Sequence, residues 1–207
     1  MRAFLKIIFF LLLPVLSGAG QSLPDSLRKI FLSSRDDSVL YKTANHLYDY
    51  YEELNRDSAF FYAGQCVQLS RKNNRKLNEA YSLSRKAYQE ENLGRYAESL
   101  HSLLNAFSIS ENTENEKYFW LIEPLGSERN KRLYVLSCTH HIFALLMWRT
   151  LNIDQEIVHF KEAKRIAVEI NRFQGKLDPC QIALCCPKFE FRGCVDVCPV
   201  VNPARSD

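Results

Sequence analysis

The sequence has little glycine and little proline, with seven of each among its 207 residues. Collagen-like chains and low-complexity linkers need far more of these two residues, so the composition excludes both classes. Lysine and arginine exceed aspartate and glutamate by only three charges, an excess too small to indicate a nucleic-acid partner. Thirteen phenylalanines and ten tyrosines supply enough apolar side chains for a packed core, so the composition favours one globular domain.

Short motifs that mark common enzymes are also missing. The chain contains no Walker loop, G-x-G-x-x-G, G-x-S-x-G, H-E-x-x-H or EF-hand loop. The paired carboxylates Glu52-Glu53 and Glu90-Glu91 are more typical of a solvated helix face than of an acid/base pair. We therefore expect no enzymatic activity, no catalytic residue and no cofactor.

Histidine and cysteine offer one candidate cluster for a metal ion. His140 and His141 follow Cys138, and His159 lies further along the chain. Adjacent side chains on a helix point about 100° apart, so His140 and His141 cannot both face one metal. A cluster of Cys138, His141 and His159 remains as an alternative, but packed or hydrogen-bonded imidazoles are the commoner arrangement. We predict no metal site.

Residues 1–20 have the three parts of a secretory signal peptide. Arg2 and Lys6 precede an apolar run over 7–16, and small residues follow at 17–20. The run is shorter than the roughly 20 residues that span a membrane. We expect cleavage after Ala19 or Gly20 and an extracytoplasmic protein, periplasmic or secreted. An uncleaved signal anchor is the alternative, and a membrane is a partner only in that case or if a downstream span is missing.

The middle of the chain is periodic at helical spacing and repeats itself. Apolar residues recur every three and four positions over residues 36–171. The segments 55–70, 94–110 and 152–171 align, with small residues at Cys66, Ala106 and Ala163. The first step is 40 residues and the second is 57, the same period with an insertion of 17. A non-repeating helical bundle is the alternative.

The second copy resembles the tetratricopeptide repeat (TPR) family in its spacing of large and small residues. The resemblance implies an all-α, right-handed TPR-like solenoid of about three helix pairs over residues 21–175. Leu54 and Leu151 stand where glycine is typical of the family, and Gly94 allows a turn with positive φ. The residues expected to pack the repeats are Leu83, Ala87, Gly94, Tyr96, Ser99, Leu103, Ala106, Phe160 and Ala163.

The predicted helices follow from these patterns. We expect a leader helix over 24–33 and three pairs, at 37–54 and 57–72, 77–93 and 96–111, and 131–150 and 154–171. Asn130 and Asn152 are the predicted N-caps of the third pair. The insertion, 112–130, should be a loop whose apolar centre at 118–122 either tucks under the solenoid or forms a contact surface.

Three tyrosines share a face of the first helix. Tyr41, Tyr48 and Tyr51 are separated by seven and three residues. If they are exposed, they form a peptide-binding surface of the kind that aromatic side chains favour. The alternative is that they pack against the leader helix or the second pair.

The last segment, 176–207, has a different character. Four prolines and five cysteines interrupt the repeat, and the spacing C-x4-C-C-x7-C-x3-C lacks the C-x2-C pairs of structural zinc sites. Three interpretations stay open: a disulfide-bonded cap, a metal site, or a tail not selected to fold, as a frameshift or truncation would leave it. We favour the third, an irregular tail that is disordered or out of register.

The resemblance also implies a function. Exported TPR regions of this period are similar to the N-terminal sensory part of membrane-bound sensor histidine kinases and related signalling proteins. We therefore expect a scaffold that binds a protein or peptide and lacks its output domain. A free secreted adaptor with a disulfide-bonded C-terminal cap is the alternative.

Overall fold

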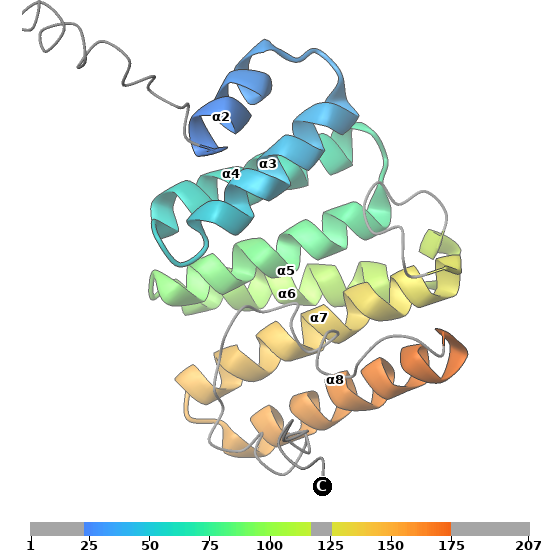
Figure 1. The fold of residues 1–207 in the computed structure, drawn as a ribbon. Coiled ribbons are helices and arrows are strands. Elements are labelled where there is room, and N and C mark those ends of the chain that lie inside the picture. Colours follow the sequence, from blue (N-terminus) through green and yellow to red (C-terminus); the bar gives the residue numbers. More distant parts are fainter. Residues whose placement is uncertain (1–22, 117–125, 175–207) are drawn as a thin grey trace, which may run out of the picture.

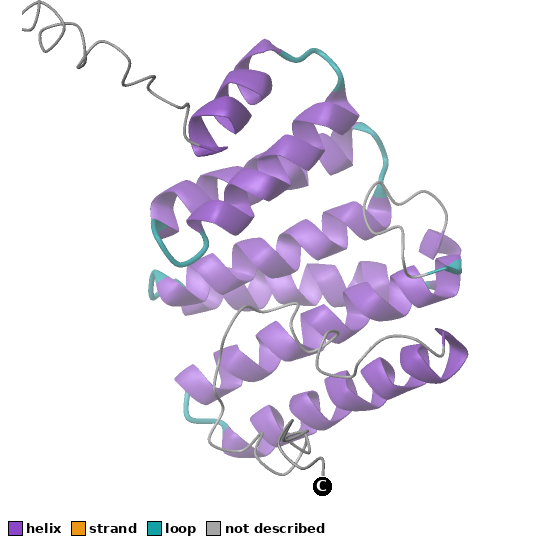
Figure 2. Ribbon diagram, viewed as in Figure 1, coloured by secondary structure: helices purple, strands orange, loops and turns teal. Residues whose placement is uncertain are grey.

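A computed structural model describes residues 23–116 and 126–174, and every regular element in these ranges is helical. Within these ranges seven α-helices follow one another. They lie as antiparallel neighbours (Figure 1), and Figure 2 shows short turns between most of them. No helix in the described ranges is long and apolar enough to cross a membrane. The elements are α2 (Leu23–Ser33), α3 (Asp37–Tyr51), α4 (Arg56–Lys72), α5 (Lys76–Asn92), α6 (Tyr96–Glu111), the 3-10 helix η2 (Thr113–Glu116), α7 (Glu128–Arg149) and α8 (Ile153–Gln174).

These helices confirm the TPR-like solenoid. The pairs α3/α4, α5/α6 and α7/α8 correspond to the three predicted repeats, and α2 is the leader helix. Each later repeat packs on the one before it through its leading helix. Helix α7 contacts α5 and α6, and helix α5 contacts α4 and exchanges side-chain hydrogen bonds with α3. The predicted signal peptide at 1–20, the apolar centre of the insertion at 118–122 and the tail at 176–207 lie outside the described residues.

The start of α7 differs from the prediction. Asn130 is not its N-cap, because the helix already begins at Glu128. Ser127 has an extended backbone, and its hydroxyl oxygen accepts a hydrogen bond from the Asn130 backbone N–H at 3.2 Å. At α8 the predicted cap is present, since the Asn152 side-chain oxygen accepts from the Gln155 N–H at 3.4 Å.

Small residues let the paired helices approach closely. Ala87, Ser99, Leu103 and Ala106 are fully buried between α5 and α6. The Ser99 hydroxyl donates to the Ala87 carbonyl oxygen at 2.9 Å, which ties the two helices together. Leu83 and Ala163 are also buried, and Phe160 is partly buried against the cluster around Ile142. Most of the predicted packing residues therefore lie in the core.

Tyr96 is the exception among the predicted packing residues. It is 42% exposed, because it is the first residue of α6 and the turn before it leaves its ring at the end of the helix pair. The prediction that Tyr96 packs the repeat is therefore wrong. Its exposure adds to an apolar outer edge of α6 that also includes Leu100 and Leu104.

Helix α5 lies at the centre of the solenoid and buries carboxylates. Glu79, Glu90 and Glu91 are each at most 6% exposed, so the prediction of a solvated face at Glu90-Glu91 is wrong. Neighbouring helices supply partners for them, because a buried charge is costly unless it is paired. Arg71 of α4 binds Glu79 at 2.7 Å, and Arg149 of α7 binds Glu91 at 3.0 Å. These ion pairs connect α5 to the repeats on both sides.

Three of the turns between helices share one hydrogen-bonded geometry. In each, the last helical turn accepts two bonds from the residues that follow it, the pattern of a Schellman motif. The 6→1 bonds run from Arg75 N to Ser70 O, from Arg95 N to Glu90 O and from Asn152 N to Met147 O, at 2.7–2.8 Å. The motif needs one residue with positive φ. These residues are Asn74 (51°), Gly94 (75°) and Leu151 (60°).

Leu151 holds this conformation with a branched, 83% exposed side chain, which costs about 1–2 kcal/mol relative to a right-handed backbone. We therefore expect Leu151→Gly to raise the free energy of unfolding by about 0.5–1 kcal/mol, after the entropy of glycine in the unfolded chain is subtracted. Urea unfolding followed by circular dichroism measures the change.

Leu54 provides the matched control. It stands at the corresponding turn of the first pair and is 70% exposed, but it is not among the residues with positive φ. Leu54→Gly should lower the free energy of unfolding by about 0.5–1 kcal/mol. Equal effects of the two substitutions would show that backbone strain at Leu151 is not the cause.

Candidate functional site

The structure places the three predicted binding tyrosines in the core. Tyr41, Tyr48 and Tyr51 are at most 8% exposed, so they do not form a peptide-binding surface and that prediction is corrected. The physical reason is that α3 lies between α2 and α5, which cover the shared face of the tyrosines. Partly buried side chains of α2 pack on this cluster, and the Tyr51 ring stacks on Tyr62 with centroids 5.9 Å apart.

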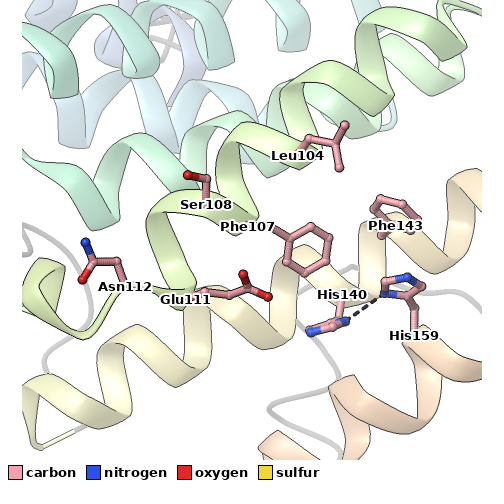
Figure 3. A pocket seen from close by; sticks show the side chains of 8 residues that line it. All are labelled: Leu104, Phe107, Ser108, Glu111, Asn112, His140, Phe143 and His159. Atoms are coloured by element: carbon pink, nitrogen blue, oxygen red, sulfur yellow. Dashed lines mark hydrogen bonds between the residues drawn. The ribbon is translucent and has the colours of Figure 1, made fainter.

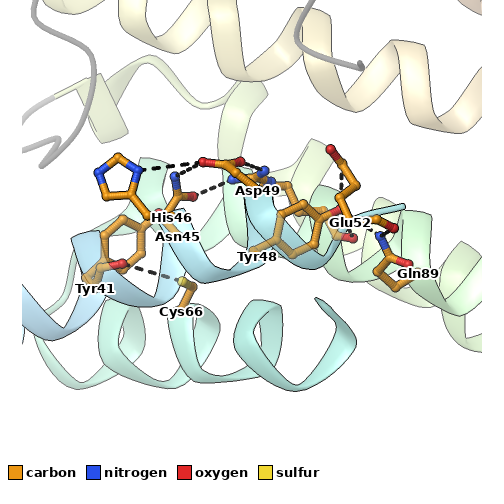
Figure 4. Close-up of polar contacts among 9 residues, drawn as sticks. Tyr41, Asn45, His46, Tyr48, Asp49, Glu52, Cys66 and Gln89 are labelled. Carbon is orange, nitrogen blue, oxygen red and sulfur yellow. Dashed lines mark hydrogen bonds and ion pairs between the residues drawn. The ribbon is translucent and has the colours of Figure 1, made fainter. Parts of the chain in front are cut away.

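The hydroxyl groups of these tyrosines bind within the chain as well. The Tyr41 hydroxyl lies 3.0 Å from the Ser82 hydroxyl. Tyr48 donates to the Glu52 carboxylate at 2.9 Å (Figure 4). Burial raises the pKa of Tyr48 well above its ordinary value of 10 and also raises the pKa of Glu52. These groups link α3 to α5 and do not point toward a ligand.

Arg85 completes this polar link between the first two repeats. Its guanidinium carbon lies 3.7 Å from the centre of the Tyr48 ring, a cation–π contact, and it donates to the Asn45 side-chain oxygen and to the Asp49 carboxylate. Gln89 adds a bond to the Tyr48 hydroxyl oxygen at 3.1 Å. The polar side chains between α3 and α5 are thus engaged with each other, which makes this face a poor candidate for the site.

An open groove lies instead between α6 and α8, over the middle of α7 (Figure 3). We call it the α6–α8 groove, and its volume is about 720 Å³. Its two ends differ in chemistry. Apolar side chains lie at one end and polar side chains of the last turn of α6 at the other, with Phe107 between them. The lining residues are Leu104, Phe107, Ser108, Glu111, Asn112, His140, Phe143 and His159.

Two imidazoles face each other in the wall of the groove. The Nδ1 atoms of His140 on α7 and His159 on α8 are 2.9 Å apart, so one of them carries the hydrogen and donates to the other. Aromatic rings hold this pair in place. Phe143 stacks on His159 with centroids 4.2 Å apart, and Phe107 meets His140 edge-on at 4.7 Å.

Burial keeps both imidazoles uncharged near neutral pH. Burial and the neighbouring His159 lower the pKa of His140 from its ordinary value of 6.5 to about 4. Burial also lowers the pKa of His159. A neutral imidazole offers one donor and one acceptor, so the pair can hydrogen-bond to a ligand without adding charge to the groove.

The alternative metal cluster of Cys138, His141 and His159 does not form. His159 pairs with His140, and His141 packs edge-on against Phe160 with centroids 5.4 Å apart. Cys138 is buried, at 8% exposure. Among the described residues, no three histidine, cysteine, aspartate or glutamate side chains are arranged to hold a metal ion.

The corresponding space between α4 and α6 is closed. There Val67, Leu83 and Ala106 are buried in one apolar cluster, at most 5% exposed. One period later, Phe107 stands at the position of Val67 and His140 at that of Leu83. Larger and more polar side chains therefore replace the sealing residues, and the groove opens where the sequence departs from its own repeat.

Most residues of this site were not predicted from the sequence. His140 and His159 were candidates, whereas Leu104, Phe107, Glu111 and Phe143 were not. An alignment of the second and third repeats contains a signal for the site. His140 aligns with Leu83, and Phe143 aligns with Lys86. A residue that departs from the internal repeat is expected at positions where its role is functional and not only to pack the core.

Comparison with known proteins agrees with the fold. Residues 24–125 match the family described as the SusR N-terminal TPR domain. The match supports the interpretation of the chain as a TPR protein, and TPR repeats are in general scaffolds that bind proteins. No curated protein and no solved structure matches the chain.

The buried histidines predict how stability depends on pH. Burial lowers the pKa of His141 to about 4, so the unfolded chain, with an ordinary value of 6.5, binds protons that the folded chain does not. The free energy of unfolding should therefore fall as the pH drops from about 6.5 toward 4. Replacing His141 by phenylalanine should reduce proton uptake on unfolding at pH 5 by about one proton.

Urea unfolding between pH 4.5 and 7.5 measures this slope. His101→Gln is the control, because His101 is exposed and its loss should leave the slope unchanged. If the His141→Phe protein had the same slope as the unmodified protein, the lowered pKa of His141 would not be the cause of the pH dependence.

Proposed function

We propose that the chain is a TPR scaffold without enzymatic activity and that it binds a protein or peptide partner in the α6–α8 groove. The observation that carries the proposal is the replacement of sealing residues by Phe107 and His140 at one inter-repeat interface. The groove is concave, partly apolar and has a few convergent polar groups, which are general features of a binding site.

Exposure of apolar side chains supports this choice. Leu104 is 54% exposed at the edge of the groove, next to the partly buried Phe107 and Phe143. Apolar surface of this kind gains free energy when a partner removes it from water, at about 25 cal/mol per Å². The arrangement suits a side chain of the partner that inserts between α6 and α8.

We further propose that the scaffold acts outside the cytoplasm, as the sensory part of a signal-transduction protein. Support comes from the signal-peptide pattern at 1–20 and from the resemblance to sensor proteins. In this role, partner binding changes the packing of the repeats, and an output domain elsewhere responds to the change. Nucleic acid is not proposed as a partner, because the net charge of +3 is small.

The secreted adaptor remains the second candidate, and the cysteines bear on it. Cys66 and Cys138 are both buried, and burial raises the pKa of Cys66 to about 12. A thiol in that state is a poor nucleophile for disulfide formation. The adaptor hypothesis therefore does not rely on Cys66 as a disulfide partner.

Leu104→Glu tests the groove. A bound partner would remove the new carboxylate from water, so the substitution should weaken binding of peptides selected from a phage-displayed library by at least tenfold. Leu100→Glu is the matched control, since Leu100 is 37% exposed one turn earlier on α6 and does not line the groove. Equal losses in the two variants, measured by fluorescence anisotropy, would place the binding surface elsewhere.

The location is tested on the protein that cells export. We expect the mature N-terminus at Gly20 or Gln21, which mass spectrometry of the intact chain identifies. Recovery of the full-length chain from the cytoplasm would contradict the extracytoplasmic role.

A further inference from the structure

The charge of the α6–α8 groove points to the chemistry of its partner. Resting on the proposed function, we propose that the groove recognises a peptide segment in which an apolar or aromatic side chain lies two to four positions from a lysine or arginine. The apolar side chain enters between Leu104, Phe107 and Phe143, and the basic side chain reaches Glu111 at the other end.

Glu111 is an unusual residue for the end of a helix. The C-terminus of a helix carries partial negative charge, so a carboxylate there is unfavourable and a cation is favourable. The last turn of α6 has no basic residue, whereas the last turn of α4 has Arg71 and Lys72. Arg71 stands one period before Glu111, so the charge at this register position is inverted in α6.

Nothing in the described part of the chain compensates this charge. Glu111 is exposed and forms no ion pair with a described residue. The groove lining contains no lysine or arginine, and its two imidazoles are held neutral. Glu162, the next carboxylate on the α8 side, is already bound by Arg165 at 2.6 Å. The polar end of the groove is therefore a negative site that a cationic ligand would complete.

The other end of the groove sets the second requirement. Leu104 and Phe143 lie there, and Phe107 lies between them and Glu111 (Figure 3). The Phe107 face adds a cation–π surface beside the carboxylate. A ligand with only a positive charge would leave the exposed Leu104 in water, and one with only an apolar side chain would leave Glu111 uncompensated.

The distance between the two ends fixes the spacing in the partner. Leu104 and Glu111 are seven residues apart on one helix, which corresponds to about 10 Å along its axis. An extended peptide covers about 3.3 Å per residue, so side chains two to four positions apart reach both ends. The neutral imidazole pair of α7 and α8, which lines the same groove, can bind the peptide backbone.

The test uses a phage-displayed library of random heptapeptides, panned on the full chain at pH 7.5. Selected peptides should combine an apolar or aromatic residue with lysine or arginine at the stated spacing. A synthetic peptide of the enriched sequence should bind at least tenfold more tightly than its copy with glutamate in place of the basic residue. In the Glu111→Lys protein this preference should reverse.

The controls separate the proposal from the function on which it rests. Glu98→Lys makes the same charge change in the first turn of α6, outside the groove, and should not alter the preference. Glu111→Lys should also raise the melting temperature by about 1–3 °C, because lysine complements the helix dipole. A melting temperature that does not rise would contradict the unfavourable placement of Glu111.

The outcomes are distinct. If Leu104→Glu abolishes binding but Glu111→Lys does not change the preference, the groove binds peptides and the proposed charge recognition is wrong. If selected peptides lack basic residues, the charge recognition is also wrong. If binding survives both substitutions, or no peptide is enriched, the groove is not the binding surface and both proposals fail.

Discussion

The whole solenoid depends on satisfying the polar side chains of one almost fully enclosed helix. Helix α5 packs against α4, α6 and α7 and exchanges side-chain hydrogen bonds with α3, so its carboxylates and amides have little access to water. An unpaired buried charge would cost several kcal/mol, and each neighbouring helix contributes a partner that avoids this cost. Arg71 and Arg149 come from opposite sides of α5, which fixes the position of the first and third repeats relative to the second.

Much of the architecture could be predicted because it follows from local periodicity. The three helix pairs, their turns and the small residues at Ala87, Ser99 and Ala106 all repeat at a constant spacing. That spacing identifies which residues share a face, but not which neighbour covers the face. Tyr41 and Tyr48 show this limit, since their face meets α2 and α5 and is buried.

The groove required a different kind of comparison. Phe107 is not unusual for a helix when considered alone, and Glu111 is unfavourable only because it stands in the last turn of α6. Each becomes informative when placed beside its counterpart one repeat earlier, Val67 and Arg71, which seal an interface and complete an ion pair. A repeat protein thus contains its own reference for packing, and positions that depart from it in both size and charge are candidates for binding.

The connection between α6 and α7 has an evolutionary consequence. Residues 112–127 join α6 to α7, and Asn112 at the start of this connection lines the groove, whereas each hairpin is closed by a turn of a few residues. Changing the length of such a connection costs little free energy, since loop-closure entropy varies slowly with length. Related chains could therefore acquire different partners by varying this connection and the last turn of α6. The three hairpins, which determine foldability, would not need to change.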